Sequence, residues 1–406
     1  MDSILIVGLI LFVGFVMGEV AEKVHLPKIS GYILAGILLN PRLLPIVPEP
    51  FTEHTDLITD IALAFITFSV GGTLLVSRIK KLGRVIALTA FFEAELALVF
   101  VIGGFIGVQV LFGGGVSQLQ AGLLIPLSVL LGALALPTDP SATLAVTHEY
   151  KARGEVSSTV MGVAAFDDAL GIINTSLCIA VAKVLLNGSS LHWTSTVVDP
   201  MLEILGGIIL GGVFGLIFNR ISGFLKRESE GAVIVIVAAT LMLCFGCAKS
   251  LGCDELLSTM AMGFVVANRN PVQDKIFQMI ERYTEELIFV LFFTLSGMHL
   301  MFSALHGVVL LILFFVLFRV SGKLCGSWLG SRLAGAPRHV RRYTGLCLIP
   351  QGGIVIGLAL SMRGMPELSG LADGLIGIVI GAVVIHELLG PVLAKTALVK
   401  SGEITK

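Results

Sequence analysis

Residues 123–150 read LLIPLSVLLGALALPTDPSATLAVTHEY. This stretch is apolar and long enough for a membrane span, yet Pro137, Thr138, Asp139 and Pro140 interrupt its middle. Two prolines remove two backbone donors and disfavour helix at the residue before each of them. The pattern therefore predicts two half-helices joined by unwound backbone. A membrane tolerates such backbone only where protein or a water-filled cavity receives its polar groups.

A second interrupted run lies in the other half of the chain. Residues 346–360 read LCLIPQGGIVIGLAL, and the break falls at residues 350–353. Half-helix ends that meet at a break carry opposed partial charges. The Asp139 carboxylate is therefore placed to compensate the positive charge at the N-terminal end of a half-helix. Transporters built from inverted repeats place their binding site where spanning helices are interrupted in this way.

The composition is that of a membrane protein. Of 406 residues, 55% are hydrophobic and 14% are charged, and the mean hydropathy is +0.97. An ordinary soluble domain carries about 25% charged residues, so a soluble enzyme, a disordered chain and a secreted disulfide scaffold are excluded. A net charge of −1 provides no basic face for nucleic acid. The six cysteines lie in or beside apolar runs, where we expect small buried side chains rather than a metal site.

Thirteen apolar runs are candidates for spanning helices, and no connection between them has room for a soluble domain. We therefore expect an all-α polytopic membrane protein, with residues 1–406 forming a single membrane transporter domain. The first run lacks a basic segment before it, so it is expected to be a retained helix and not a signal peptide. The runs begin near Ile4, Pro27, Asp56, Val85, Ala121, Val156, Val198, Gly231, Asp254, Glu285, Gly307, Tyr343 and Ala372.

The basic residues predict the orientation. If the N-terminus is outside, 21 of the 27 Lys and Arg residues fall in inside loops or the inside tail, and 4 fall outside. Such a bias is typical of cytoplasmic loops, so it favours an N-out, C-in topology and an odd number of spans. Among the inside loops, the sequence places Arg78, Lys80, Lys81 and Arg84 between the third and fourth spans.

An internal repeat agrees with thirteen spans. Residues 21–40 resemble residues 248–267 at a constant offset. If spans one to six repeat as spans eight to thirteen, the offset of seven helices is odd and the two halves have inverted topology. The repeats would cover about residues 1–186 and 231–400, with a linker helix at about 198–220.

Two adjacent acids occupy the middle of the sixth run, residues 156–182: Asp167 and Asp168. Each carboxylate at the centre of a spanning helix costs about 2.5–3.5 kcal/mol on insertion scales. Desolvation and mutual repulsion both favour protonation, and the two acids titrate as a coupled pair. Because protons and a hard cation compete for the same oxygen lone pairs, this pair has the chemistry of a cation–proton exchange site.

The eleventh run supplies two cations, Arg319 and Lys323, four residues apart and so on one helix face. Pairing of one of them with an aspartate of the sixth run is expected, and the alternative is that they extend toward the membrane interface. Lys323 is the candidate with proton chemistry, because a buried lysine can release its proton and an arginine cannot.

Other polar residues in the spans have simpler interpretations. Glu93 and Glu95 in the fourth run belong either to a second polar site or to a dimer surface. His386 and Glu387 in the last run are expected to form a packed polar pair.

These motifs resemble the monovalent cation:proton antiporter superfamily, over essentially the whole chain. The resemblance rests on Thr138-Asp139-Pro140, Asp167-Asp168, Gly322-Lys323 and the break at 350–353, in that order. The aspartate pair with the later lysine is similar to the NapA-like sodium/proton antiporters of the second family. The Thr-Asp-Pro break is more usual in the NhaP-like first family, which normally has Asn-Asp instead of Asp-Asp.

The resemblance implies a homodimer with the Na⁺/H⁺ antiporter fold, two crossed broken helices and elevator-type alternating access. It implies that Asp168 carries either cation or proton, and that Asp167 pairs with Lys323 when no cation is bound. Thr138 and the backbone near Asp139 would complete the shell of the cation. Asp-Asp members are typically electrogenic, so two protons per sodium ion are expected.

The predicted function is therefore monovalent cation:proton antiport, with Na⁺ the expected cation and Li⁺ or K⁺ possible alternatives. No cofactor and no enzymatic activity are expected. The partners are cations, protons, the lipid bilayer and a second copy of the chain, and the location is a prokaryotic plasma membrane. A sodium-coupled symporter of the bile-acid type is the nearer alternative. An intramembrane aspartyl protease is a remote one, since the sequence lacks the glycine pattern of that class and a protease has no use for a buried lysine.

Overall fold

The computed structural model describes residues 2–404, apart from residues 25, 53–54, 113–120, 188–197, 223–229, 299–308 and ten positions between 353 and 367. Every regular element in this part of the chain is helical, as predicted. The chain divides into two compact units, Met1–Gly83 with Met201–His299 and Arg84–Pro200 with Leu300–Lys406, which we call unit 1 and unit 2.

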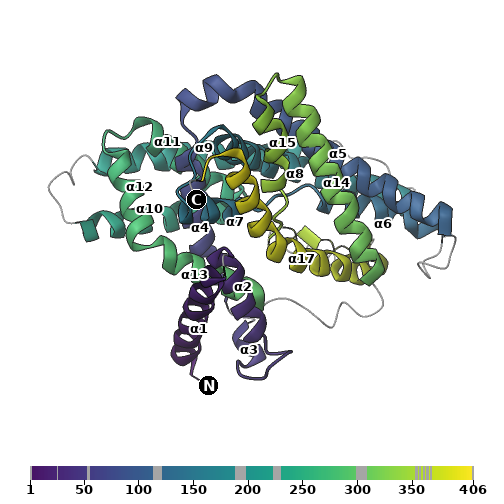
Figure 1. The fold of residues 1–406 in the computed structure, drawn as a ribbon, viewed down its shortest axis with the longest axis horizontal. Helices are drawn as coiled ribbons and strands as arrows, with labels where there is room; N and C mark the ends of the chain where they lie inside the picture. The colour runs from purple at the N-terminus through teal and green to yellow at the C-terminus, as the bar shows by residue number, and fades with distance from the viewer. Residues whose placement is uncertain are drawn as a thin grey trace. The chain divides into compact units, whose positions relative to one another are not determined.

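Unit 1 holds the first helices of the chain and those that follow its midpoint (Figure 1). Within it, α1 packs against α2, α2 against α13, and α4 against α11. Its elements are α1 (Ser3–Lys23), α2 (Lys28–Leu38), α3 (Glu49–Thr52), α4 (Asp56–Thr73), α9 (Asp199–Ser222), α10 (Glu230–Leu251), α11 (Glu255–Arg269), α12 (Gln273–Tyr283) and α13 (Glu285–Met298).

Unit 2 contains both interrupted runs. Its elements are α6 (Ala121–Leu134), α7 (Pro140–Glu149), α8 (Glu155–Asn187), α14 (Val309–Leu333), α15 (Arg338–Cys347) and α17 (Ser369–Ser401), together with most of α5 (Val76–Phe112). Helix α6 stops before the first break, residues 135–139, and α7 starts at Pro140. Helix α15 stops before the second break, residues 348–352. Both breaks therefore fall where the prolines predict them.

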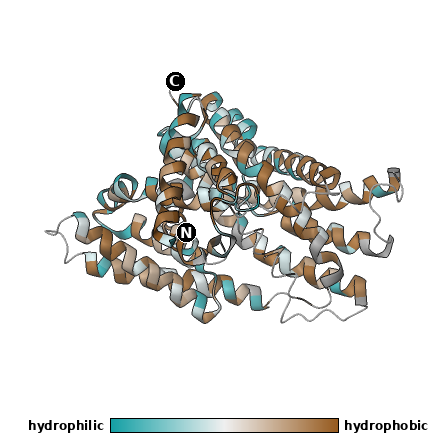
Figure 2. Cartoon of the chain, turned by 90° about the horizontal axis from the view of Figure 1, so that it is seen from below, coloured by the Kyte–Doolittle hydropathy of each residue, from teal (hydrophilic) through white to brown (hydrophobic). Residues whose placement is uncertain are grey.

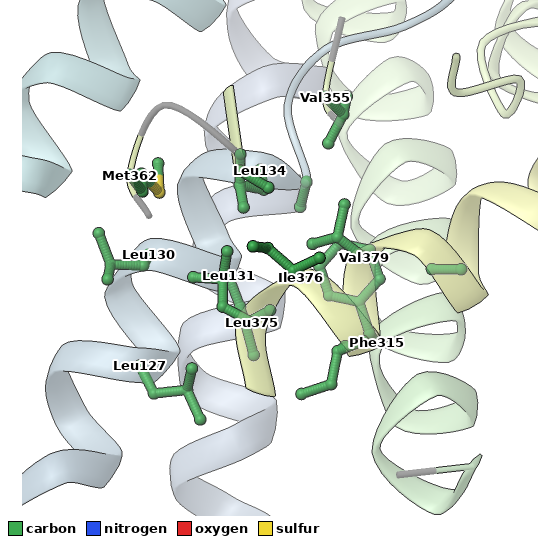
Figure 3. Packing of buried hydrophobic residues seen from close by; sticks show 14 of the residues in the cluster. Leu127, Leu130, Leu131, Leu134, Phe315, Val355, Met362, Leu375, Ile376 and Val379 are labelled. Atoms are coloured by element: carbon green, nitrogen blue, oxygen red, sulfur yellow. The ribbon is translucent and has the colours of Figure 1, made fainter. Parts of the chain in front are cut away.

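The apolar core of unit 2 lies beside the breaks. Leucines of α6, Phe315 of α14 and the Leu375–Val379 turn of α17 face one another (Figure 3). Val355 and Met362, which follow the second break, belong to the same cluster. This packing holds α6, which precedes the first break, and the residues that follow the second break against α14 and α17.

The chain end also stabilises unit 2. Gly402 ends α17 in the left-handed conformation that glycine adopts without steric cost (φ +81°). The turn brings the Glu403 carboxylate to the first turn of α8, where it accepts from the amides of Val156 (2.5 Å) and Ser157 (2.9 Å). A carboxylate at this position satisfies free amides and complements the helix dipole.

Seven helices in the described part of the chain are long and apolar enough to cross a membrane. Figure 2 shows that hydrophobic residues, coloured brown, predominate along many of the helices. They lie at Ser3–Lys23, Lys80–Val110, Glu155–Leu186, Met201–Ser222, Glu230–Leu251, Val309–Leu333 and Gly374–Ser401, with shorter apolar helices at Lys28–Leu38, Leu57–Thr73 and Leu124–Leu134. The count of thirteen, the N-out orientation and the inverted relation of the halves stay predictions.

The prediction of a loop at residues 78–84, before the fourth span, is wrong. Helix α5 begins at Val76, so Arg78, Lys80, Lys81 and Arg84 all lie within it and not in a connection. The apolar pattern starts only at Val85, but Lys and Arg are good helix formers and no proline interrupts the segment. A charged N-terminal segment therefore extends the helix beyond its apolar part.

Asp254, between α10 and α11 and outside the spans, gives a pH-dependent prediction. Burial raises its pKa from 3.8 to about 6, while its side chain caps α11 by accepting from the Leu257 amide (2.6 Å). A raised carboxyl pKa favours the protonated form in the fold, so a penalty appears as pH rises from about 4 to about 6 and is complete above 6.

Asp254→Asn keeps the capping oxygen and removes this penalty. After allowance for solvent screening of a half-buried group, we expect about 1 kcal/mol of added stability above pH 6 and a shrinking gain below it. Thermal unfolding in detergent at several pH values measures this. A gain that is equally large at pH 4 would contradict the assignment.

Candidate functional site

The two breaks lie against each other inside unit 2. The Asp139 amide donates to the Pro350 carbonyl (3.0 Å), and the Gln351 side-chain amide donates to the Leu134 carbonyl (2.6 Å). Each interrupted segment thus supplies a hydrogen-bond partner for a backbone group that has none within its own helix. This mutual pairing satisfies part of the exposed backbone without water.

Arg319 of α14 holds both breaks. Its guanidinium donates to the carbonyls of Ala135 (2.9 Å) and Pro137 (2.9 Å) in the first break and of Ile349 (2.7 Å) in the second. These carbonyls follow the C-terminal ends of α6 and α15, where the helix dipole is negative. The side chain is fully buried, so it does not extend to an interface. Its contacts make it a structural clamp of the unwound backbone.

Lys323, one turn further along α14, joins the first break to two acids. Its Nζ donates to Glu93 (2.9 and 3.1 Å), Asp167 (3.2 Å), the Leu136 carbonyl (2.6 Å) and Thr138 Oγ1 (2.7 Å). Lys323, Glu93 and Asp167 are 0% exposed, and Thr138 is buried. The pairing of Asp167 with Lys323 that the resemblance implies is therefore present in this structure.

The cluster holds one ammonium between two carboxylates in an interior that lacks the screening of bulk water. A second cation that approached the carboxylates would compete with the ammonium for their oxygens. A proton added to either carboxylate would instead weaken its bond to the ammonium. The arrangement can therefore couple cation binding to a change of protonation.

A glycine stripe on α14 brings Lys323 to Glu93. A Cβ built at Gly322, Gly326 or Gly330 would lie 2.6, 2.5 or 2.7 Å from the Cα of Ala97, Glu93 or Thr89 on α5. Residues four apart on one helix thus face residues four apart on the other, as in the small-residue interfaces of membrane helices. The two backbones come close enough for the Lys323 and Glu93 side chains to meet.

Gly326→Ala is expected to destabilise the protein by about 1–3 kcal/mol, because the added methyl meets α5 backbone and not a movable side chain. The matched control is Gly246→Ala on α10, where nothing lies within 4 Å of the new Cβ. That change is expected to be neutral or stabilising by up to about 1 kcal/mol. Thermal unfolding in detergent compares the two, and equal effects would exclude the close α5–α14 contact.

Asp139 belongs to a second acidic cluster. It caps α7, with Oδ1 accepting from the Ser141 amide (2.8 Å) and hydroxyl. Its Oδ2 and both carboxylate oxygens of Glu387 on α17 lack a hydrogen-bond donor in the described part of the chain. A Cβ at Gly352 would lie 2.5 Å from Asp139 Oδ2 and 3.1 Å from a Glu387 oxygen, so the two carboxyls converge on this glycine.

His386 connects this region to the second break. Its Nδ1 lies 2.9 Å from the Gln351 side-chain oxygen, and His386, Gln351 and Glu387 are all buried. The expected pairing of His386 with Glu387 is replaced by separate contacts, because adjacent residues on a helix point in different directions.

The structure gathers only part of the predicted site. Thr138, Asp167 and Lys323 meet in one cluster, whereas the Asp139 side chain faces Ser141 and Glu387. Asp168 follows Asp167 in α8, and its side chain lies outside the described residues. Among the described residues, no three His, Cys, Asp or Glu side chains are arranged to hold a metal ion.

The sequence alone does not identify Lys323 as the partner of Glu93. The available signal was the GxxxGxxxG spacing of Gly322, Gly326 and Gly330, which predicts a close helix contact beside Lys323. The glycine spacing does not show which helix makes this contact. That it is α5 cannot be read from a single sequence.

Comparisons with a family model and with curated relatives all point to cation/proton exchangers. Residues 7–400 match the family model described as "Sodium/hydrogen exchanger, transmembrane". The chain is 26% identical over 359 residues to the Na⁺/H⁺-K⁺ antiporter GerN of Bacillus cereus, covering 87% of this chain and 86% of the relative. It is 23% identical over 383 residues to the ammonium/H⁺ antiporter subunit AmhT of Alkalihalophilus pseudofirmus, covering 92% and 91%.

A solved structure shares the fold. The sodium proton antiporter MjNhaP1 of Methanocaldococcus jannaschii superposes with a TM-score of 0.78 at 21% identity, covering 98% of each chain. Its structure at pH 8 gives a TM-score of 0.73 over the same coverage. At this identity, the likeness establishes the fold alone.

Proposed function

Because this chain belongs to the sodium/hydrogen exchanger family, we propose that it exchanges a monovalent cation, most simply Na⁺, for protons across a membrane. It is a multi-pass plasma-membrane transporter and not an enzyme, which removes the aspartyl protease alternative. The observation that supports the proposal best is Lys323 buried between Glu93 and Asp167 beside the first break.

In the proposed cycle, Asp168 binds either the cation or a proton, and Thr138 with the backbone near Asp139 contributes oxygens to the cation. Asp167 releases Lys323 as the cation arrives. The present contacts, with Lys323 bonded to Asp167 and Thr138, are those expected before the cation binds. Glu93 adds a second acid that keeps Lys323 in place when Asp167 lets go.

The finer features rest on the resemblance and on the Asp-Asp pair. They are a NapA-like membership, two protons per sodium ion, elevator-type alternating access and a homodimer. Moving one net charge against 100 mV involves about 2.3 kcal/mol, so the stoichiometry decides whether the membrane potential drives the cycle. The printed names of the relatives include Na⁺, K⁺ and ammonium, so the choice of Na⁺ is part of the proposal.

Flux in proteoliposomes tests this function. A pH-sensitive dye inside the vesicles reports proton movement when Na⁺, Li⁺ or K⁺ is added outside, with the membrane potential clamped at zero and then released. Cation-dependent proton flux that changes on clamping supports electrogenic antiport. Flux that is unaffected by clamping would indicate one-for-one exchange and a structural Asp167. No flux with any of the three ions would favour the sodium-coupled symporter instead.

A further inference from the structure

A pocket of about 840 Å³ lies between the C-terminal part of α14 and α15, and its lining does not include Lys323, Glu93 or Asp167. It combines an apolar wall from α14 with four arginines from both helices. The lining side chains used below are Leu324, Trp328, Arg332, Arg338, Arg341 and Arg342.

The four arginines have no carboxylate partner in the described part of the chain. Arg332 lies over the Trp328 ring, 4.9 Å from its centroid, and Arg341 Nε donates to the Ala336 carbonyl (2.5 Å). Neither contact neutralises the charge. Four positive charges therefore converge on one cavity, where an anion would be attracted and a cation repelled.

The place of the pocket near the C-terminal end of α14 indicates which class of anion would bind there. The helix has 25 residues and a length of about 37 Å, which exceeds the roughly 30 Å hydrocarbon core of a bilayer. Its last turns, with Trp328 and Arg332, therefore reach the headgroup level, where tryptophan is enriched in membrane proteins. Trp328 is 46% exposed and Leu333 is 51% exposed, so apolar surface continues beside the arginines.

Guanidinium groups bind phosphate oxygens through paired, charge-assisted hydrogen bonds. An acyl chain would lie along Leu324 and Trp328 while the phosphate meets the arginines. A soluble phosphate would use only the basic half of this pocket, and a zwitterionic lipid would add an ammonium beside four positive charges. Basic pockets between membrane helices have this preference for anionic headgroups.

We propose that the pocket between α14 and α15 is a binding site for the headgroup of an anionic glycerophospholipid. The site is distinct from the Lys323 cluster, and occupancy would stabilise the turn that connects α14, which carries Arg319 and Lys323, to the second broken helix. The lipid is therefore expected to act on stability independently of the exchanged cation.

Thermal unfolding of the purified full-length protein in detergent tests the proposal. Three additives are titrated: dioleoyl phosphatidylglycerol, dioleoyl phosphatidylcholine with the same chains, and glycerol 3-phosphate with no chains. Phosphatidylglycerol is expected to raise the melting temperature, and the other two are expected to leave it nearly unchanged. An equal response to phosphatidylcholine, or a full response to glycerol 3-phosphate, would overturn the proposal.

The double variant Arg338→Gln/Arg342→Gln locates the binding. Each arginine near an anionic lipid surface contributes to the binding free energy. Removing two of them is expected to raise the half-saturating phosphatidylglycerol concentration by roughly 30-fold. The matched control, Arg220→Gln/Arg269→Gln, removes the same charge from the last turns of α9 and α11 and is expected to titrate like wild type. Binding unchanged in the first variant, or lost equally in the control, would contradict the site. If the first variant fails to fold, the lipid comparison on the wild-type protein still decides.

Discussion

Asp168→Asn is expected to abolish cation-dependent proton flux while leaving a folded, membrane-inserted protein. Asparagine has almost the same shape as aspartate, but its side-chain amide neither ionises nor releases a proton at any pH at which the protein is folded. It therefore removes the group for which cation and proton are proposed to compete, without creating a cavity. The expected effect is a complete loss of exchange rather than a change in apparent affinity.

The measurement is proton flux in proteoliposomes after a Na⁺ step, with melting temperature and elution volume in detergent as checks of folding. Asp199→Asn is the matched control, since Asp199 is an exposed residue in the first turn of α9. It is expected to retain wild-type flux. Retained cation-dependent flux in Asp168→Asn would remove Asp168 from its proposed role.

Lys323→Ala is expected to produce the largest loss of stability. The change leaves Glu93 and Asp167, both 0% exposed, without the ammonium that both now contact. Removing one partner of a buried ion pair typically costs about 3–5 kcal/mol, because the remaining charge has no water to solvate it. Thermal unfolding in detergent measures the loss.

Two comparisons separate charge from packing. Lys323→Met combined with Glu93→Gln and Asp167→Asn removes all three charges at similar volume, and it is expected to recover most of the stability. Lys249→Ala breaks the surface pair with Asp60 (2.7 Å), where Lys249 is 59% exposed, and is expected to cost about 0–1 kcal/mol. An unchanged melting temperature for Lys323→Ala would contradict the buried pairing.

The sequence predicts most of the backbone of this fold. Pro137 and Pro140 fix the first break through local chemistry, since proline removes a donor whatever surrounds it. The apolar runs give the helices, because membrane spans need length and hydrophobicity more than particular partners. The same logic misplaces the start of α5, where a charged N-terminal segment continues the helix.

Partners were harder to predict than positions. Lys323 and Asp167 each stand out as charges within apolar runs, so the cost of burial predicts that one cation of the eleventh run pairs with an aspartate of the sixth. The resemblance to the antiporter superfamily is what singles out Asp167 and Lys323. Glu93 stands out equally, but its partner depends on how closely α14 approaches α5, which the glycine stripe sets. The resemblance places Asp139 with Thr138 around the cation, whereas its side chain caps α7 at Ser141 and approaches Glu387 of α17, which depends on how α7 packs against α17.

Competition between cation and proton for the same carboxylates is the central claim, and proton release tests it directly. Purified protein in weakly buffered detergent near pH 7.5 receives NaCl or, as a control for ionic strength, choline chloride, while the pH is recorded. Wild-type protein is expected to release protons with Na⁺ and not with choline, and Asp168→Asn is expected to release none. Na⁺ binding without proton release, or equal release from wild type and Asp168→Asn, would contradict the account.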